Sequence, residues 1–372
     1  MNNTQRGFSL IELMIGLVIG LIATLVITNV FSKFEQQKRV TTGGADAQTN
    51  GSIALYTMRR EIENAGYGLP VFNQDITPLR CPINVTYDHD VNGATPEIGL
   101  SPVVIIDGGA GSDNVVVRYG STMKSGASVE IQSVPDPTPT LQVPTALGCT
   151  KNDTALVIQE ISTTTLRCAM GRVTEVATAP NQRIKLTNIS PSGTAVPVTA
   201  GFKVACMGAW NETNFRLTNN QLMRTGATVA PANPDETALP DATEFPVVSD
   251  IVSIQAQYGV SQVDTSNLVT QWVDATGIWS AGAMTVANRN RIKAVRVAVV
   301  ARNSLREQMP VSQSCDGVAA GLARVCIWNE TTNVNLAADA NWQNYRYKVY
   351  ETVIPLRNVL WNRIAFCGGT PC

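Results

Sequence analysis

The chain has 372 residues, with 28 lysines and arginines against 29 aspartates and glutamates, one histidine and eight cysteines. At roughly 150 residues per domain, this length allows two or three units with real hydrophobic cores. The formal net charge is −1, so the chain lacks the excess of positive charge that nucleic-acid-binding proteins use to bind phosphates. No nucleic-acid partner is therefore expected. The single histidine, His89, excludes a metal site that needs two imidazoles.

The first predicted element is an apolar segment from Phe8 to Phe31, in which Glu12 is the only ionisable residue. As a helix it spans about 36 Å, which is enough to cross a bilayer with some tilt. A secretory signal peptide has an apolar region of only about 7 to 15 residues, followed by a small-residue cleavage site. No such site precedes Lys33. The segment is therefore expected to remain on the chain as a membrane anchor.

Glu12 needs a compensating partner, because a carboxylate at the centre of a membrane helix costs about 2.5 to 3.5 kcal/mol. If the chain were cut just before Phe8, the new α-amine of one subunit would lie within reach of Glu12 on a neighbour in a staggered pair of helices. The alternative is a glutamate that only reaches the lipid headgroups. Gly16 and Gly20 permit close helix contact in lipid, but glycine is common in membrane helices.

The junction before the apolar run carries the most specific signal. A polar leader, MNNTQRG, ends at Gly7, and the chain continues Phe8-Ser9-Leu10-Ile11-Glu12. This pattern resembles the class III signal of type IV prepilins. The resemblance implies that a membrane-embedded prepilin peptidase cuts between Gly7 and Phe8 and methylates the new amine of Phe8. It also implies that Glu12 acts in assembly.

Beyond the membrane a narrow stripe of small and apolar residues predicts that the helix continues to a glycine C-cap at Gly66. Glycines at 43, 44 and 51 predict a kink or frayed turn near 41 to 51. Arg59 and Arg60 beside Glu61 and Glu63 predict a solvated or locally paired surface. The stripe consists of Val40, Gly44, Ala47, Gly51, Leu55, Met58, Ile62 and Ala65.

The rest of the chain is rich in Val, Thr, Asn, Pro and Gly, which predicts short strands with turns between them. Four strands are predicted over 114–119, 248–258, 292–302 and 345–354. In the last, Tyr345, Tyr347, Val349 and Val353 share the face that is expected to be buried. The Thr- and Pro-rich stretch at about 121–245 is expected to form an insertion or elaborated loops.

The cysteines indicate the compartment. All eight follow residue 80, their number is even and none forms a C-x-x-C pair, which favours disulfides in an oxidising compartment. Residues beyond 32 are therefore placed outside the cytoplasm. Two short loops predict local bridges, Cys315 with Cys326 and Cys367 with Cys372; the other four cysteines stay unassigned.

One weak metal candidate lies in a polar turn. Asp88, Asp90 and Asn92 match the first three ligand positions of a calcium loop, but position 12 is Gly99 instead of a glutamate. A simple polar turn is the favoured interpretation. We expect no catalytic residue, no cofactor and no other metal site, and hence no enzyme.

Five segments, in the same order, resemble the PilW family of minor pilins. The resemblance implies an α+β, pilin-like fold, in which a long membrane-spanning N-terminal helix packs on an antiparallel β-rich, disulfide-stapled head. The expected units are a leader (1–7), the helix (8–66, with 8–31 in the membrane and 32–66 outside it) and the head (67–372). The segments lie at 43–68, 112–121, 245–260, 290–303 and 345–358.

The same resemblance implies a function and a set of partners. The chain would join the inner-membrane priming complex that starts pilus assembly, with its head in the periplasm, and would end at the pilus tip on the cell surface. Its partners would be the prepilin peptidase, other minor pilins, the major pilin, a large tip adhesin and the inner-membrane assembly platform. The alternatives are a type II secretion pseudopilin, or a membrane-tethered periplasmic binding module or enzyme.

Overall fold

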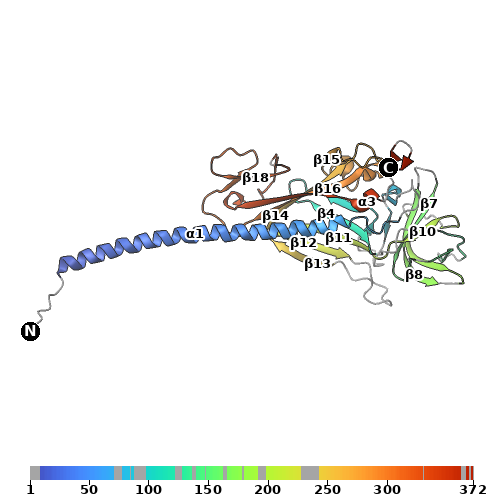
Figure 1. Cartoon of the computed structure of the whole chain (residues 1–372), viewed down its shortest axis with the longest axis horizontal. Helices are drawn as coiled ribbons and strands as arrows, with labels where there is room; N and C mark the ends of the chain where they lie inside the picture. Colours follow the sequence, from blue (N-terminus) through green and yellow to red (C-terminus); the bar gives the residue numbers. More distant parts are fainter. Residues whose placement is uncertain are drawn as a thin grey trace, which may run out of the picture.

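One long helix carries a β-rich head on its C-terminal half, and its N-terminal half extends away from the head (Figure 1). The structure is a computed structural model. It describes residues 9–70, 78–83, 85–87, 98–121, 128–135, 140–146, 148–161, 166–177, 180–191, 198–227, 243–329, 331–361, 366–367 and 370–371.

The helix α1 runs without a break from Leu10 to Glu63. The predicted interruption near 41–51 is wrong, because the glycines there lie within continuous helix. The helix ends at Glu63 with Asn64 as its C-cap, and not at Gly66. Gly66 adopts φ +75° in the turn that follows, and its N–H donates to the Arg118 carbonyl at 2.9 Å.

The C-terminal half of α1 packs on the head through a stripe that differs slightly from the predicted one. Gly43 and Ala54 are buried, whereas Gly44 and Leu55 are only half-buried. A Cβ at Gly51 would overlap the Tyr350 ring. Close approach of the helix to the sheet therefore depends on residues without side chains. The fully buried or nearly buried members are Ala47, Ala54, Met58, Ile62 and Ala65.

A four-stranded antiparallel sheet lies directly against α1, in the order β15-β14-β16-β20. Val295, Val297 and Val299 of β16 point into the core that this sheet shares with the helix. The strands are β14 (Ile251–Val260), β15 (Gln271–Val273), β16 (Ile292–Arg302) and β20 (Tyr347–Pro355).

A five-stranded antiparallel sheet, in the order β13-β12-β11-β4-β3, completes this core. The Asp113 carboxylate ties it to the first sheet, accepting hydrogen bonds from the N–H groups of Gly108 at 2.9 Å and Ala256 at 2.8 Å. Burial raises the pKa of Asp113 to about 6. The strands are β3 (Val103–Ile106), β4 (Asn114–Gly120), β11 (Trp210–Thr218), β12 (Gln221–Ala227) and β13 (Thr243–Ser249).

A six-stranded sheet lies beyond the C-terminal end of α1 (Figure 1), in the order β5-β10-β7-β8-β9-β6. A backbone bridge between Ser133 and Gln142 joins its two edges, so the sheet closes into a small barrel with its own core. The strands are β5 (Val129–Glu130), β6 (Thr140–Gln142), β7 (Thr154–Glu160), β8 (Leu166–Ala177), β9 (Arg183–Pro191) and β10 (Lys203–Cys206).

A small lobe covers part of the outer face of β16, where Ala298 and Val300 meet Val325, Ile327 and Trp328. It contains β17 (Ser312–Ser314), β18 (Ala323–Ile327) and β19 (Thr332–Asn333). The other described elements are β1 (Thr86–Tyr87), β2 (Ile98–Gly99), β21 (Phe366–Cys367), β22 (Thr370–Pro371), α2 (Val286–Arg291), α3 (Arg357–Trp361), η1 (Pro78–Arg80), η2 (Gly277–Trp279) and η3 (Trp342–Asn344).

Two strand predictions need correction. The predicted strand 248–258 is two strands, because Asp250 adopts φ 60° and turns the chain from β13 into β14. In β20, Tyr350 and Ile354 face the main core, while Val353 on the opposite face is 55% exposed. The predicted burial of a single face is therefore wrong, since the lobe and the helix cover different sides of the strand.

The contact at Gly51 yields a stability prediction. Gly51→Ala should lower the free energy of unfolding by about 1 to 3 kcal/mol, because the new methyl group overpacks against Tyr350 and Ala301. Gly44→Ala is the matched control, since a Cβ there meets nothing within 4 Å. It should raise stability by up to about 1 kcal/mol through helix propensity. Calorimetry of the full chain in detergent measures both; equal shifts would contradict the close packing at Gly51.

Candidate functional site: the helix terminus and the anchor of the head

The described chain starts at Ser9, which is the N-cap of α1. The Glu12 carboxylate accepts a hydrogen bond from the Ser9 backbone N–H at 3.0 Å, and is otherwise exposed. Glu12 therefore lies at the end of α1, with its side chain turned back toward the chain terminus. Gly7 and Phe8 lie outside the described residues.

The N-terminal half of α1 is the one helix among the described residues with the length and composition to cross a membrane. The candidate span is Leu10–Glu35, with a mean hydropathy of 2.7. Its large apolar side chains are exposed all round, from Leu10 to Phe34. A helix that is apolar on every side and covered by no protein is suited to lipid. A Cβ at Gly16 or Gly20 would meet nothing within 4 Å, so these positions are open to a neighbouring helix.

Three polar side chains within this span form hydrogen bonds to the backbone of the helix itself. The Thr24 hydroxyl donates to the Gly20 carbonyl at 2.7 Å, and the Thr28 hydroxyl donates to the Thr24 carbonyl at 2.9 Å. The Asn29 amide donates to the Leu25 carbonyl at 3.0 Å. Because these groups bond to the backbone one turn earlier, lipid would meet few unpaired polar atoms. Glu12 differs from them in having an ionisable side chain.

At its other end, α1 is tied to the five-stranded sheet by Glu61. The Glu61 carboxylate accepts hydrogen bonds from the Tyr119 hydroxyl at 2.9 Å and from Arg224 at 2.8 Å. Burial, and then the Glu61 charge, raise the pKa of Tyr119. The predicted surface pairing holds for Arg59 and Glu63, which lie 2.8 Å apart. It is wrong for Glu61, because only the fold brings Tyr119 and Arg224 next to it.

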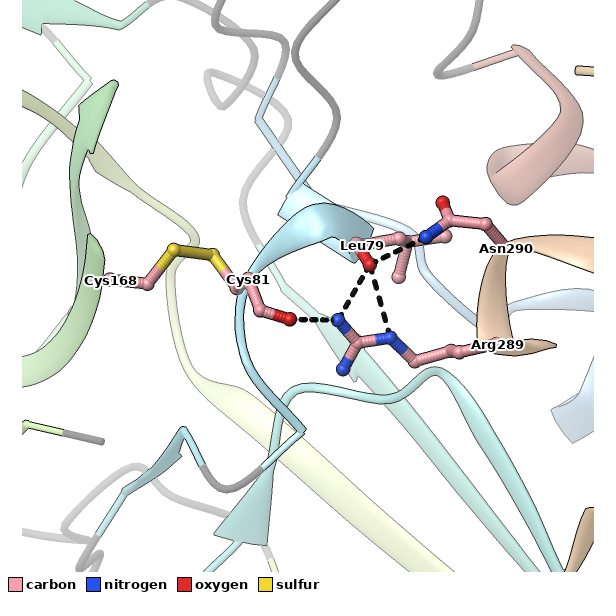
Figure 2. The surroundings of a disulfide bond; sticks show 5 residues. All are labelled: Leu79, Cys81, Cys168, Arg289 and Asn290. Carbon is pink, nitrogen blue, oxygen red and sulfur yellow. Dashed lines mark hydrogen bonds between the residues drawn. A yellow bond between two sulfur atoms is a disulfide. The ribbon is translucent and has the colours of Figure 1, made fainter. Parts of the chain in front are cut away.

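A buried arginine holds the segment around Leu79 and Cys81, which follows the helix in the chain (Figure 2). Arg289 of α2 is 3% exposed and donates to the Leu79 carbonyl at 2.6 and 3.2 Å, and also to the Cys81 carbonyl. The Asn290 amide donates to the same Leu79 carbonyl at 2.9 Å. Burial lowers the pKa of Arg289 to about 10. The sequence run Val286–Arg291 gives no sign of this role, since arginine usually lies at the surface.

The segment held by Arg289 is also linked to the barrel by a disulfide. Cys81 is bonded to Cys168 of β8, with the two Cα atoms 5.6 Å apart (Figure 2). The predicted bridge between Cys315 and Cys326 is present. A third bridge, Cys149–Cys206, lies within the barrel. The 87-residue separation of Cys81 and Cys168 explains why spacing alone could not pair them.

Some predicted residues lie outside the described part of the chain. These are the weak calcium candidates Asp88, Asp90 and Asn92, together with Cys372, the partner predicted for Cys367. Among the described residues, no group of three or more histidine, cysteine, aspartate or glutamate side chains could hold a metal ion.

Comparison with known proteins adds two family matches. Residues 2–28 match the family model described as the prokaryotic N-terminal methylation motif. Residues 211–358 match the model described as type IV pilus-assembly protein W, or PilW. A solved type IV-like pilin from Thermus thermophilus is 10% identical, with a TM-score of 0.33, and the alignment covers 85% of this chain and 97% of that one. No curated protein matches the chain.

The membrane-suited helix, the methylation motif and the β-rich head define the chain as a type IV pilin-like protein with a prepilin signal. Within that class it is PilW-like, since the matched domain runs from β11 through β20 and includes the sheet on which α1 packs. The motif implies processing by a prepilin peptidase and association with other pilus components. Pilins are structural proteins.

The disulfides give a second stability prediction. In the chain-entropy description, the bridge across 87 residues contributes about 4.6 kcal/mol and the bridge across 11 residues about 2.8 kcal/mol. The double variant Cys81→Ser/Cys168→Ser should therefore lose more stability than Cys315→Ser/Cys326→Ser. Calorimetry of the two purified variants, without reductant, measures the difference. A smaller loss for the Cys81–Cys168 pair would contradict the role of this bridge as the anchor of the barrel.

Proposed function

We propose that this chain is a low-copy subunit that primes type IV pilus assembly in the inner membrane and ends at the tip of the fibre. In this proposal its head lies in the periplasm before assembly. The single observation that carries the proposal is the size and position of the head. Two sheets flank α1, and a closed barrel extends beyond the end of the helix (Figure 1).

The space around a helical filament limits the size of a head that can be repeated along it. Subunits of a helical filament bury their helices in its centre and place their heads around it, so each head has the space set by the helical rise. A head with a main core, a lobe and a separate barrel would collide with its neighbours if it were repeated at every step. A few copies at one end avoid this. The barrel, which continues the axis of α1 (Figure 1), would then project from the tip.

The proposal assigns Glu12 a role in entry into the fibre. Before assembly its carboxylate is held by the Ser9 N–H at the end of the helix. In the fibre it would pair with the methylated amine of Phe8 on a neighbouring subunit. An opposite charge at close range in a low-dielectric environment attracts far more strongly than in water, so the pair would select correctly staggered helices. Other minor pilins, the major pilin, a tip adhesin and the assembly platform are the proposed partners, and no catalytic role is proposed.

The test removes the charge and keeps the hydrogen-bond acceptor. Glu12→Gln retains an oxygen that can accept from the Ser9 N–H, so the protein should reach the membrane at its normal level. It should be reduced at least tenfold in sheared surface fibres, since the amide cannot pair with a cation. Immunoblots of the membrane and fibre fractions measure both.

Glu35→Gln is the matched control, because Glu35 is exposed at the opposite end of the candidate span. This variant should enter fibres normally. Normal incorporation of Glu12→Gln would refute the pairing role. Copy numbers in fibres equal to those of the main subunit would refute the tip position.

A further inference from the structure

The strand β20 forms an open edge of the four-stranded sheet. On one side it pairs with β16, and no other described strand pairs with it. Two hydrogen bonds fix which residues face β16: Asn303 N–H to the Arg346 carbonyl at 2.8 Å, and Leu356 N–H to the Lys293 carbonyl at 2.9 Å. Bonded pairs recur at every second residue of an antiparallel ladder. The backbone groups that point away from β16 are therefore those of Tyr347, Val349, Glu351 and Val353.

A groove runs along this edge. Its volume is about 750 Å³, it is open to solvent, and β20 forms one wall with Tyr347, Val349 and Glu351. The opposite wall belongs to β18 and includes Arg324 and Cys326. Because Cys326 is bonded to Cys315, a disulfide braces this wall. The groove is thus bounded by a strand edge with free backbone groups and by a covalently braced lobe.

The charges along the groove favour an acidic occupant. Lys348 and Arg324 line it and are exposed. Among the described lining residues the only acidic one, Glu351, accepts hydrogen bonds from the backbone N–H groups of Trp328 at 2.5 Å and Asn329 at 3.5 Å. The described lining residues therefore carry a net positive charge, and the Glu351 carboxylate is partly compensated by the lobe.

We propose that this groove binds an extended, acidic segment of a partner protein, which adds a strand to the free edge of β20. Strand addition uses the outward backbone groups for affinity and side chains of alternate residues for specificity. Natural proteins protect open edges with short strands, prolines or covering elements. β20 has nine residues, and its one proline, Pro355, is at its very end. The strand β18, which supplies one wall of the groove, lies on the side of the head nearer to the N-terminal half of α1 (Figure 1).

This proposal goes beyond the pilus role and stands on the geometry of the β20 edge and on the charges of the groove. Its test uses the full chain in detergent and two synthetic nonapeptides that differ only in charge, TVEVTVEVT and TVKVTVKVT. The glutamate peptide should slow amide hydrogen exchange at Val349, Glu351 and Val353. It should bind roughly three- to fivefold more tightly than the lysine peptide, as expected for one partly exposed ion pair.

Two variants make the test specific. Val349→Pro removes an outward N–H donor without breaking the ladder to β16, so it should abolish binding of the glutamate peptide. Lys348→Glu changes an exposed side chain and should reverse the preference between the peptides, which provides a test even if the proline variant folds poorly. Failure of the glutamate peptide to protect these amides would overturn the proposal. Equal binding of both peptides to the wild-type chain and to Lys348→Glu would also overturn it.

Discussion

A single unbroken helix has to satisfy two environments, and the rest of the structure depends on how its residues divide between them. From Leu10 to Phe34 the large apolar side chains are exposed on every side, as a lipid-spanning segment requires. From Gly43 onward, one face becomes a row of small or buried residues on which two sheets converge. The head can approach the helix closely only because Gly43 and Gly51 carry no side chain.

The position of the head follows from this division. Glu61 ties the last turns of α1 to the five-stranded sheet, so the core is anchored at the end of the helix far from the membrane span. The barrel lies beyond the C-terminal end of α1 (Figure 1). The Cys81–Cys168 bridge links it to the segment that Arg289 holds in place. The barrel lies outside the matched PilW domain, which starts at residue 211.

Sequence reasoning found features that depend on local pattern. The apolar run, the strand Ile292–Arg302 and the short-loop bridge Cys315–Cys326 are all determined by neighbouring residues. Features that depend on distant contacts were missed. The barrel depends on pairing of strands that lie far apart in the chain, such as β5 with β10, and Glu61 and Arg289 meet partners more than 50 residues away. Helical glycines were expected to interrupt α1, but tertiary packing outweighs their weak helix propensity.

In the proposed function, this chain is processed as a prepilin and is built into a fibre through its exposed helix. Mass spectrometry of the N-terminal peptide, from membranes and from sheared surface fibres, tests that claim most directly. The predicted result is a peptide that starts at N-methylated Phe8 in the fibre fraction, at low abundance. An unprocessed Met1 terminus in both fractions would contradict it and would leave a β-rich head tethered by a permanent anchor.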